Sequence, residues 1–443
     1  MSSLLTQSLF STSAMVAVFN DTSRLQAMLD AEAGLARAQS SVGIIPVQAV
    51  SPIVKACDAG LYDLHDLAQG TAAAGNPAIP LVAALTRQVA AYDREAALWV
   101  HHGATSQDVI DTGQMIQARA ALALIHTDLD RIEAALAGLT IAHADTIMAG
   151  RTLLQHAVPI TFGLKAAGWL DSLRRARRAL KAAGDDLAPQ LGGAVGSLGA
   201  MGADGPDVLD ALADELGLVS APSWHARRER IALLGCALAV LTGALGKAAL
   251  DLALMMQTEV GEAFEPVVAG GGGSSAMPHK RNPVALVAVQ AAARQAPGLS
   301  ATLMSLMLQA HERDIGGWHA EWEVLPELFG LAAGASARMA DVLEGLELDV
   351  ERMRRNLALT QGLPFAESAA LTLTPLLGRS EAHALVKTAS ARAASQAISL
   401  RLALEADPVA GEALKGRFDE VFDPARTLKA VPELIRRLTR SDL

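Results

Sequence analysis

A glycine-rich segment at residues 270–283, GGGGSSAMPHKRNP, is the strongest candidate for chemistry in this sequence. Glycine has no side chain, so four glycines in a row let the backbone approach a ligand closely. The segment then supplies two hydroxyls and three basic groups, on Ser274, Ser275, His279, Lys280 and Arg281. It is not a phosphate-cradling P-loop, because the Gly-Lys-Ser/Thr ending is absent and no strand is predicted before it. These residues predict an anion-binding lid, and the alternative is a flexible surface linker.

A second polar segment, VHHGATSQDVIDT at residues 100–112, comes just before a predicted long helix. The side chains that could bind a carboxylate are those of Thr105, Ser106 and Gln107. Asp108 could cap the helix, and an ordinary N-cap is the plainer interpretation of this segment taken alone. His101 and His102 are adjacent, so they cannot share a helix face as metal ligands would, and partners at suitable spacing are missing. We therefore expect no metal site.

Two further segments carry polar or aromatic side chains. The segment GRTLLQHAVPITFG, residues 150–163, offers polar groups just before a proline, on Arg151, Thr152 and Gln155. The segment QAHERDIGGWHAEWE, residues 309–323, contains His311, Arg313, Trp318 and Trp322. Two tryptophans around a Gly-Gly break favour core packing, unless this segment meets the other three in the fold.

A protein built mainly from helices must position these segments. The chain has 443 residues and a mass of 46.0 kDa, with 51% hydrophobic but only 3% aromatic residues. Ala, Leu, Val and Gly therefore fill the interior, which favours closely packed helices and argues against a β-sandwich. The formal net charge of −10 means that the chain as a whole lacks the basic footprint of a nucleic-acid-binding protein.

Helical periodicity and helix-end residues predict where these elements lie. Ser23 and Gln26 form a capping-box pattern, and Gly43 is expected to end that first helix. Long helices are predicted at Thr112–Ala149, Phe162–Ala188, Arg227–Glu262 and Pro283–Glu312. No strand longer than a few residues is predicted. The pattern favours an N-terminal helical domain, a central long-helix domain and a small C-terminal helical domain, at residues 1–111, 112–348 and 349–443.

The cysteines and the apolar runs bear on the compartment. Cys57 and Cys236 lie far apart, so neither a disulfide framework nor a zinc site is expected, and a reducing compartment fits. The uncharged run at residues 231–246 has sixteen residues, fewer than the roughly twenty that span a bilayer, and is expected to be a buried helix. The first twenty residues lack the Lys or Arg of a secretory signal. We expect a cytoplasmic protein that binds neither membranes nor nucleic acid.

The motifs resemble those of the fumarase and aspartase superfamily, also called the fumarase/adenylosuccinate lyase family. GSSAMPHKRNP at residues 273–283 is similar to its signature, and HHGATSQD and GRTLLQHA resemble its other active-site regions. The resemblance covers essentially the whole chain. It implies a three-domain, all-α protein with a long central helical bundle, whose helices form a twenty-helix core in a homotetramer. Each active site would use segments from three subunits and bind a small polycarboxylate.

The resemblance also implies residue roles. Ser275 corresponds to the catalytic base that removes a proton next to a substrate carboxylate, and Lys280 and Asn282 correspond to the pair that binds this carboxylate. His101 matches the histidine before Gly-x-Thr-Ser and is expected to orient or protonate the ligand. The remaining candidates for substrate binding are Thr105, Ser106, Arg151, Gln155, Ser274, Arg313 and Trp318. We expect neither a metal nor an organic cofactor, because positioning and charge neutralisation would supply most of the acceleration.

Leu153 is the informative departure from the family pattern. Members that expel an amine or water usually carry a histidine after Thr152, and leucine cannot transfer a proton. A carboxylate leaving group, with a pKa of about 4, needs no such acid. The resemblance therefore points to the 3-carboxy-cis,cis-muconate cycloisomerase branch, which residues 309–323 and the Gly75-Asn76-Pro77 loop also resemble. It implies cofactor-independent closure to 4-carboxymuconolactone in protocatechuate catabolism, the β-ketoadipate pathway.

Two alternatives remain open. One is an adenylosuccinate lyase-type enzyme or another lyase that releases fumarate. The other is a catalytically silent helical scaffold, because a fold by itself does not establish an activity. The presence of Ser275, Lys280 and Asn282 argues against the scaffold.

Overall fold

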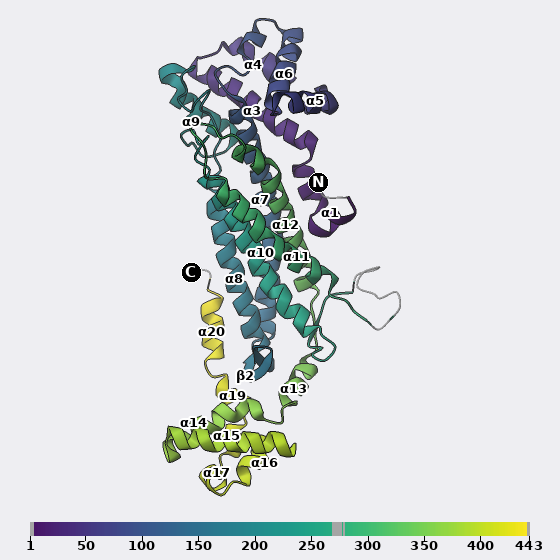
Figure 1. Ribbon diagram of the computed structural model, residues 1–443, viewed down its shortest axis with the longest axis vertical. Helices are drawn as coiled ribbons and strands as arrows, with labels where there is room; N and C mark the ends of the chain where they lie inside the picture. The colour runs from purple at the N-terminus through teal and green to yellow at the C-terminus, as the bar shows by residue number, and fades with distance from the viewer. Residues whose placement is uncertain (1–3, 268–276, 278–279, 441–443) are drawn as a thin grey trace. The chain divides into compact units, whose positions relative to one another are not determined.

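The computed structural model describes residues 4–267, 277 and 280–440 (Figure 1). The chain divides into two compact units, each built from three separate stretches. The first unit comprises Met1–Asp130, Arg175–Gly246 and Ala288–Arg338. The second unit comprises Arg131–Arg174, Lys247–Val287 and Met339–Leu443. The predicted division into three domains at residues 111 and 348 stays a prediction.

The described residues form mostly α-helices. Before the first long helix lie α1 (Leu4–Phe10), α2 (Ser13–Val18), α3 (Asp21–Val42), α4 (Val47–Ala56), α5 (Leu64–Ala74) and α6 (Ala78–Tyr92). The next helices are α7 (Ser106–Ala142), α8 (Phe162–Gly184), α9 (Gly205–Leu216), α10 (Glu229–Met255), α11 (Val284–Ser305) and α12 (Gly317–Glu344). The last are α13 (Val350–Ala358), α14 (Ala366–Leu377), α15 (Arg379–Gln396), α16 (Leu400–Glu405), α17 (Pro408–Ala413), α18 (Phe418–Val421), α19 (Pro424–Thr427) and α20 (Val431–Leu438).

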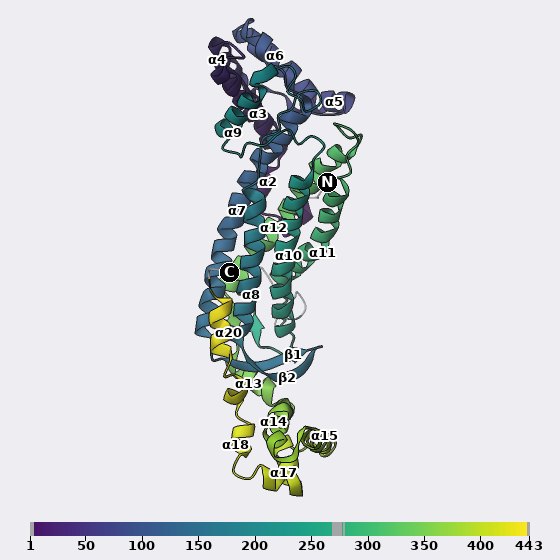
Figure 2. The ribbon, with the colours of Figure 1, turned by 90° about the vertical axis from the view of Figure 1, so that its left-hand side faces the viewer.

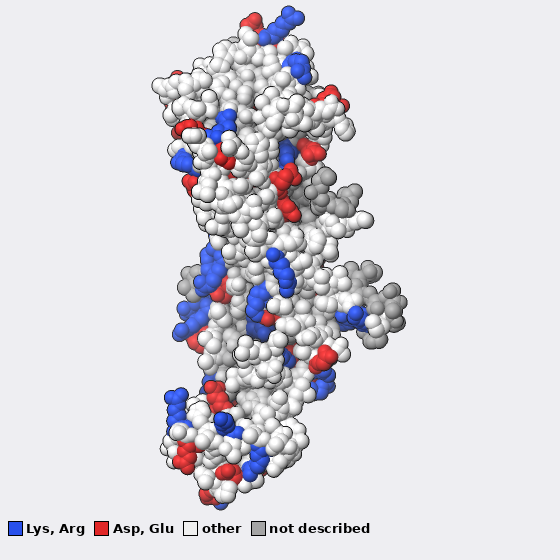
Figure 3. Space-filling view, viewed as in Figure 1, with Lys and Arg blue, Asp and Glu red and all other residues white. Residues whose placement is uncertain are grey.

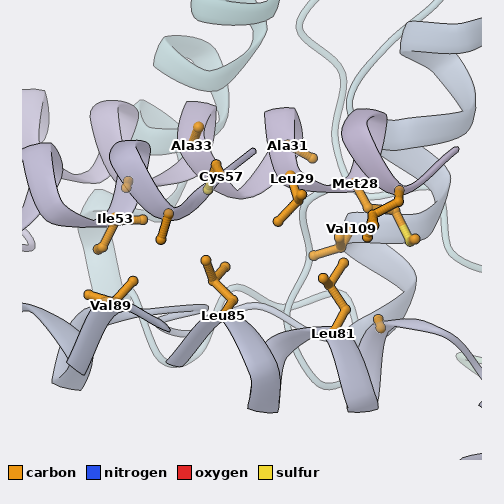
Figure 4. Packing of buried hydrophobic residues seen from close by; sticks show 14 of the residues in the cluster. Met28, Leu29, Ala31, Ala33, Ile53, Cys57, Leu81, Leu85, Val89 and Val109 are labelled. Carbon is orange, nitrogen blue, oxygen red and sulfur yellow. The ribbon is translucent and has the colours of Figure 1, made fainter. Parts of the chain in front are cut away.

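Helix α3 is the central element of the buried N-terminal cluster in the first unit. It packs against α4 and α9, and Ile53 of α4 and Leu85 and Val89 of α6 face one another across this cluster (Figure 4). These side chains are almost fully buried, and the apolar area removed from water stabilises the arrangement. The segment at residues 100–112 continues directly from this packed region into α7.

The ends of α3 test the predicted helix signals. The helix begins at Asp21 instead of Ser23, because the side chain of Asn20 accepts a hydrogen bond from the Ser23 backbone N–H at 2.8 Å and caps it. The Ser23 hydroxyl donates to the carbonyl of Ala17 instead. The predicted end is confirmed: Gly43 has a φ of 90°, a left-handed conformation that glycine adopts without strain.

A β-hairpin in the second unit, with strands of 6 and 7 residues, overturns the prediction that no strand is longer than a few residues. Helix α7 ends at Ala142, and strands β1 (Ile147–Thr152) and β2 (Gln155–Thr161) pair antiparallel where a helix was predicted to continue to Ala149 (Figure 2). The β-branched residues in these strands favour pairing over helix continuation. Gly150 is required at the irregular position of β1, because a Cβ there would lie 2.6 Å from the Val158 carbonyl oxygen.

The other long helices agree with prediction in place more than in length. Helix α8 begins at Phe162 as predicted but ends at Gly184, four residues before Ala188. Helices α10 and α11 also end earlier than predicted, at Met255 and Ser305. After α10 the chain forms β3 (Ala263–Phe264), which pairs antiparallel with β4 (Glu347–Leu348). The earlier end of α11 leaves residues 306–316, which include Arg313, outside a helix.

Helix α10 is long and apolar enough to cross a membrane by length and composition. However, 61% of its most apolar window is buried within the fold. It is therefore a core helix, as predicted from its sequence.

Candidate active site

Thr105 immediately precedes α7, and its hydroxyl is directed to a distant arginine. Helix α7 begins at Ser106, six residues before the predicted start at Thr112, and Asp108 is its third residue. The backbone N–H of Thr105 donates to Asp108 Oδ2 at 2.9 Å, so Asp108 stabilises the helix start as one half of a capping box and not as the N-cap residue. The Thr105 hydroxyl oxygen accepts from Arg313 Nη2 at 3.0 Å. Because the oxygen is the acceptor in this bond, the hydroxyl hydrogen remains available to donate to a carboxylate.

Arg313 joins two of the four predicted segments. Its Nε donates to Gln107 Oε1 at 3.1 Å, and its Nη2 also donates to the carbonyl of Ala194 at 3.2 Å. The segment at residues 309–323 therefore meets the segment at residues 100–112, which is one of the three that its functional interpretation required. Ser106, at the first position of α7, lies half-buried beside these contacts.

Asp108 fixes the glycine-rich break that supplies the Ala194 carbonyl. Its carboxylate accepts from the backbone N–H groups of Gly192 and Gly193, both at 2.9 Å. The same carboxylate lies 2.7 Å from Nε2 of His225, which is also buried. Nδ1 of His225 is buried with no hydrogen-bond partner among the described residues. Asp108 thus holds the start of α7 and this loop together.

Trp318 is a packed residue at the edge of this region. Its side chain is 2% exposed, and its indole N–H donates to Asp111 Oδ1 at 2.9 Å. The ring packs edge to face against Trp322, with ring centroids 4.9 Å apart. The predicted contact between Trp318 and substrate stays a prediction, while the core packing expected of the two tryptophans is confirmed.

A buried ion triad, which the sequence analysis missed, lies behind Trp318. The guanidinium of Arg228 bonds Asp111 Oδ2 at 2.7 Å and Glu321 Oε1 at 3.0 Å, and all three side chains are almost completely buried. Burial raises the pKa of Glu321 to about 6, although Arg228 partly opposes this shift. Two features of the sequence could have indicated this triad. The charged Arg228 lies just before an apolar helix, and the charged Glu321 lies between two tryptophans.

His101 is held by a carboxylate that the sequence did not reveal. Its Nδ1 lies 2.6 Å from Oε1 of Glu32, which is buried on α3. Burial alone would lower the pKa of His101, but the charge and hydrogen bond of Glu32 more than offset burial, so its pKa is raised. His101 also has a φ of 57°, in the left-handed region. The pair is suited to keep a protonated imidazole.

The predicted residues of the hairpin lie in the second unit. Arg151 forms a bidentate ion pair with Glu262, in which Nη1 bonds Oε2 at 2.8 Å and Nη2 bonds Oε1 at 2.6 Å. The side-chain amide of Asn356 donates to the same buried carboxylate at 2.7 Å. Gln155 begins β2 and is exposed. The guanidinium of Arg151 therefore already has a fixed protein partner, and its backbone pairs with His156 near the tip of the hairpin.

The hairpin turn consists of Leu153, which departs from the family pattern, and Leu154. Leu153 and Leu154 have φ values of 51° and 65°, and their exposed fractions are 96% and 74%. Both angles are in the left-handed region that two-residue hairpin turns require and that favours glycine or asparagine. An aliphatic side chain is thus presented at the tip, where it offers no proton to a leaving group.

The basic end of the signature is also in the second unit. Arg281 bonds Glu347 at 2.9 and 3.1 Å, so its charge is neutralised within the fold. Lys280 is exposed and Asn282 is half-buried, which leaves both side chains accessible for a substrate carboxylate. Ser274, Ser275 and His279 lie outside the described residues, so the predicted roles of Ser274 and Ser275 stay predictions.

Family models and known proteins match most of the chain. A family model described as Lyase matches residues 9–298, and one described as Adenylosuccinate lyase C-terminus matches residues 362–438. The 3-carboxy-cis,cis-muconate cycloisomerase of Pseudomonas aeruginosa is 50% identical over 95% of this chain and 92% of its own. Nitrosuccinate lyase of Streptomyces davaonensis is 45% identical over 95% of this chain and 91% of its own.

A solved structure supports the same fold. The crystal structure of the 3-carboxy-cis,cis-muconate lactonizing enzyme from Pseudomonas putida matches with a TM-score of 0.92 and 44% sequence identity. The match covers 98% of both chains. The mostly helical fold predicted from the sequence is therefore confirmed.

Proposed function

Because the chain belongs to the Lyase family, whose fumarase and aspartase members its motifs resemble, we propose that it is a 3-carboxy-cis,cis-muconate cycloisomerase. Cycloisomerases of this name are 41% to 50% identical to it over nearly its full length. The observation that carries the choice of a weakly basic leaving group is Leu153, which stands exposed at the hairpin tip where members that expel an amine or water usually carry histidine. The proposed role is a step in protocatechuate catabolism.

The reaction is an intramolecular addition. One substrate carboxylate attacks an alkene carbon, a C–O bond forms, and the electron pair of the alkene moves to the carbon next to another carboxylate. That carbon then takes up one proton, so the product is an isomer of the substrate. In the reverse direction a carboxylate leaves, and such a weak base requires no acid at position 153. The nucleophile is part of the substrate, so the chemistry requires neither a metal nor an organic cofactor.

The first unit supplies part of the proposed substrate site. Arg313 binds one carboxylate of the trianionic substrate through its guanidinium, and the Thr105 and Ser106 hydroxyls donate to it. The contacts of Arg313 with Thr105 and with the Ala194 carbonyl support this role, because they set the guanidinium in place before substrate arrives. Trp318 contributes a packed apolar wall.

The signature and the hairpin supply the remaining proposed contacts. Lys280 and Asn282 bind the carboxylate next to the carbon that becomes negatively charged. Arg151, Gln155 and Ser274 complete the polar lining. Ser275 delivers the proton to carbon in the lactonising direction and removes it in reverse.

His101 orients the ligand or supplies a proton. The raised pKa of His101, caused by the Glu32 charge and hydrogen bond overcoming burial, supports a protonated imidazole near neutral pH. A cation beside a trianionic substrate also lowers the energy of the charge that develops during the addition.

We further propose a homotetramer with shared active sites. Leu233 and Val240 on α10 are 60% and 55% exposed, and with alanines of α8 they line an apolar groove of about 300 Å³. In Figure 3 the surface over the upper part of α10 is mostly white, and blue Lys and Arg side chains lie further down the helix. A second copy of the chain is the proposed cover for this groove, since exposed apolar stripes of this kind mark interfaces.

The free thiols of Cys57 and Cys236 support a cytoplasmic location.

Incubation of the purified protein with 3-carboxy-cis,cis-muconate tests the function. We expect loss of the diene absorbance and formation of a lactone. Adenylosuccinate and nitrosuccinate are assayed in parallel. Nitrosuccinate lyase is the second candidate, because that relative is 45% identical and nitrite is another weakly basic leaving group, so Leu153 suits it equally. Turnover of either of these two substrates, with the muconate unchanged, would contradict our choice.

A further inference from the structure

We propose that Gln107 is a positioning residue that holds the Arg313 guanidinium in the orientation in which it binds a substrate carboxylate. This inference rests on the proposed function. Gln107 is completely buried and its Oε1 accepts from Arg313 Nε at 3.1 Å. Gln107 has no exposed surface and bonds Arg313, so its effect on substrate binding passes through the arginine.

The orientation of the Gln107 amide is determined by its neighbours. Its Nε2 donates to Asp111 Oδ2 at 3.2 Å and to the His225 carbonyl at 3.0 Å. Both partners are acceptors only, since one is a carboxylate and the other a carbonyl. A flipped amide would set its oxygen against two acceptors and its NH₂ group against the Arg313 N–H. The oxygen therefore faces Arg313 in the single arrangement that satisfies all three hydrogen bonds.

Asp111 is itself immobilised, which gives this arrangement a rigid base. It is paired with the buried guanidinium of Arg228 and accepts from the indole N–H of Trp318. Carboxylates with several fixed donors have little freedom to rotate. Gln107 thus links Arg313 to the packed interior of the first unit.

The hydrogen bonds of Arg313 divide its guanidinium into an anchored edge and a free nitrogen. Nε bonds Gln107, and Nη2 bonds Thr105 and the Ala194 carbonyl. A guanidinium has five N–H groups, and among the described residues Nη1 has no hydrogen-bond partner. The anchored edge leaves the two Nη1 hydrogens for a substrate carboxylate. Without Gln107 the planar group could rotate about its last bonds, and binding would have to restore its orientation.

The test is a double-mutant cycle on purified protein with 3-carboxy-cis,cis-muconate. Gln107→Met keeps the length and apolar bulk of the side chain but removes the amide. We expect the KM to rise by about 10- to 100-fold, the range for a hydrogen bond to a charged group, with kcat changed much less. Arg313→Lys keeps a positive charge but removes the planar guanidinium and its several N–H donors. We expect Gln107→Met to raise the KM of Arg313→Lys no further, because the lost partner is shared.

Gln114→Leu is the matched control. Gln114 is also buried on α7, and its Oε1 has no hydrogen-bond partner among the described residues, so its loss should leave the KM unchanged. If Gln107→Met does not fold, Gln107→Ala, which leaves room for water, takes its place. A wild-type KM in the folded Gln107 variant, or an equal increase in the Arg313→Lys background, would overturn this inference alone. Lack of turnover by wild-type protein would overturn the proposed function as well.

Discussion

Nδ1 of His101 lies 2.6 Å from Oε1 of Glu32, a carboxylate that is buried on α3 and precedes His101 by 69 residues. The imidazole itself is only partly buried, so the second ring nitrogen can face a ligand while the first is held. The carboxylate fixes the ring orientation and favours the protonated form. If His101 acts as proposed, this pair makes the activity dependent on pH.

Glu32→Gln should move that dependence to lower pH. Without the negative charge, burial dominates and the pKa of His101 falls below its usual range near 6.5. If protonated His101 is required, kcat/KM will then begin to decline at a lower pH than in the wild type. The measurement is a pH profile together with an NMR titration of the imidazole. Asp30→Asn, an exposed carboxylate on the same helix, is the control and should leave the profile in place.

The same pair has a defined effect on stability. Because the folded pKa of His101 is raised, its contribution to stability is fully present below about pH 6.5 and is lost as pH rises through the folded pKa. The free energies of unfolding of wild type and Glu32→Gln, measured with denaturant, should therefore approach each other at alkaline pH. This holds for the part of their difference that comes from protonation of His101. A difference independent of pH would assign the loss to packing instead.

Ser275→Ala tests the proposed proton transfer. Removal of a positioned acid or base typically lowers the rate by about 10² to 10⁴-fold, so we expect a loss of this size in kcat. The free energy of unfolding should barely change, because the residue is expected in a glycine-rich loop and not in the core. Steady-state rates and thermal unfolding provide both readings. Unchanged turnover would remove Ser275 from the mechanism.

Leu153→His tests the nature of the leaving group. If the departing group in the reverse reaction is a carboxylate, an imidazole at the hairpin tip gives little benefit, and the rate should stay within a few-fold of the wild type. Leu153→Asn is the matched polar control, since asparagine also tolerates the left-handed turn. A large gain with histidine but not with asparagine would refute the carboxylate argument.

Glu321→Gln should change how stability depends on pH. Burial raises the pKa of Glu321 from 4.5 to about 6, so protonation favours the folded state. The corresponding contribution is fully present below pH 4.5 and is lost as pH rises through about 6. The variant cannot titrate at this position, so its stability should fall less than that of the wild type over this interval. Glu323→Gln, which alters an exposed carboxylate, should behave as the wild type in urea unfolding.

Arg228→Met should destabilise the first unit strongly. It leaves the carboxylates of Asp111 and Glu321 buried without their cation, and loss of one partner of a buried pair costs about 3–5 kcal/mol. Urea unfolding at neutral pH measures the change. Arg37→Met, which removes an exposed ion pair with Glu215, should cost less than about 1 kcal/mol. Equal effects of the two substitutions would contradict the importance of burial.

Features set by neighbouring residues were predicted well. Gly43 ends α3, Phe162 begins α8, and Asp108 stabilises the start of α7, because each depends on residues within one turn. The predicted start of α3 at Ser23 was wrong, since Asn20 was available to cap one turn earlier. The hairpin was missed because a helical periodicity was extended past Ala142 into residues that pair with a strand instead.

The partners of the candidate site were not predictable in the same way. Local patterns carry no information on which distant side chains will meet, and a buried charge reveals its partner only in the fold. Arg228 reaches Asp111 across 117 residues and Glu321 across 93. The division of the chain into functional segments was visible, but the carboxylates that organise them were not.

The sequence by itself determined the family, the mostly helical fold and the residue types available for the chemistry, because short motifs and periodicities are written locally. Only the tertiary structure decided that Arg313 bonds Thr105 across 208 residues, that Glu32 holds His101 and that Gln107 faces a guanidinium. A hydrogen bond near 3 Å between such distant residues forms only when packing of the whole unit offsets the entropy of closing the chain between them.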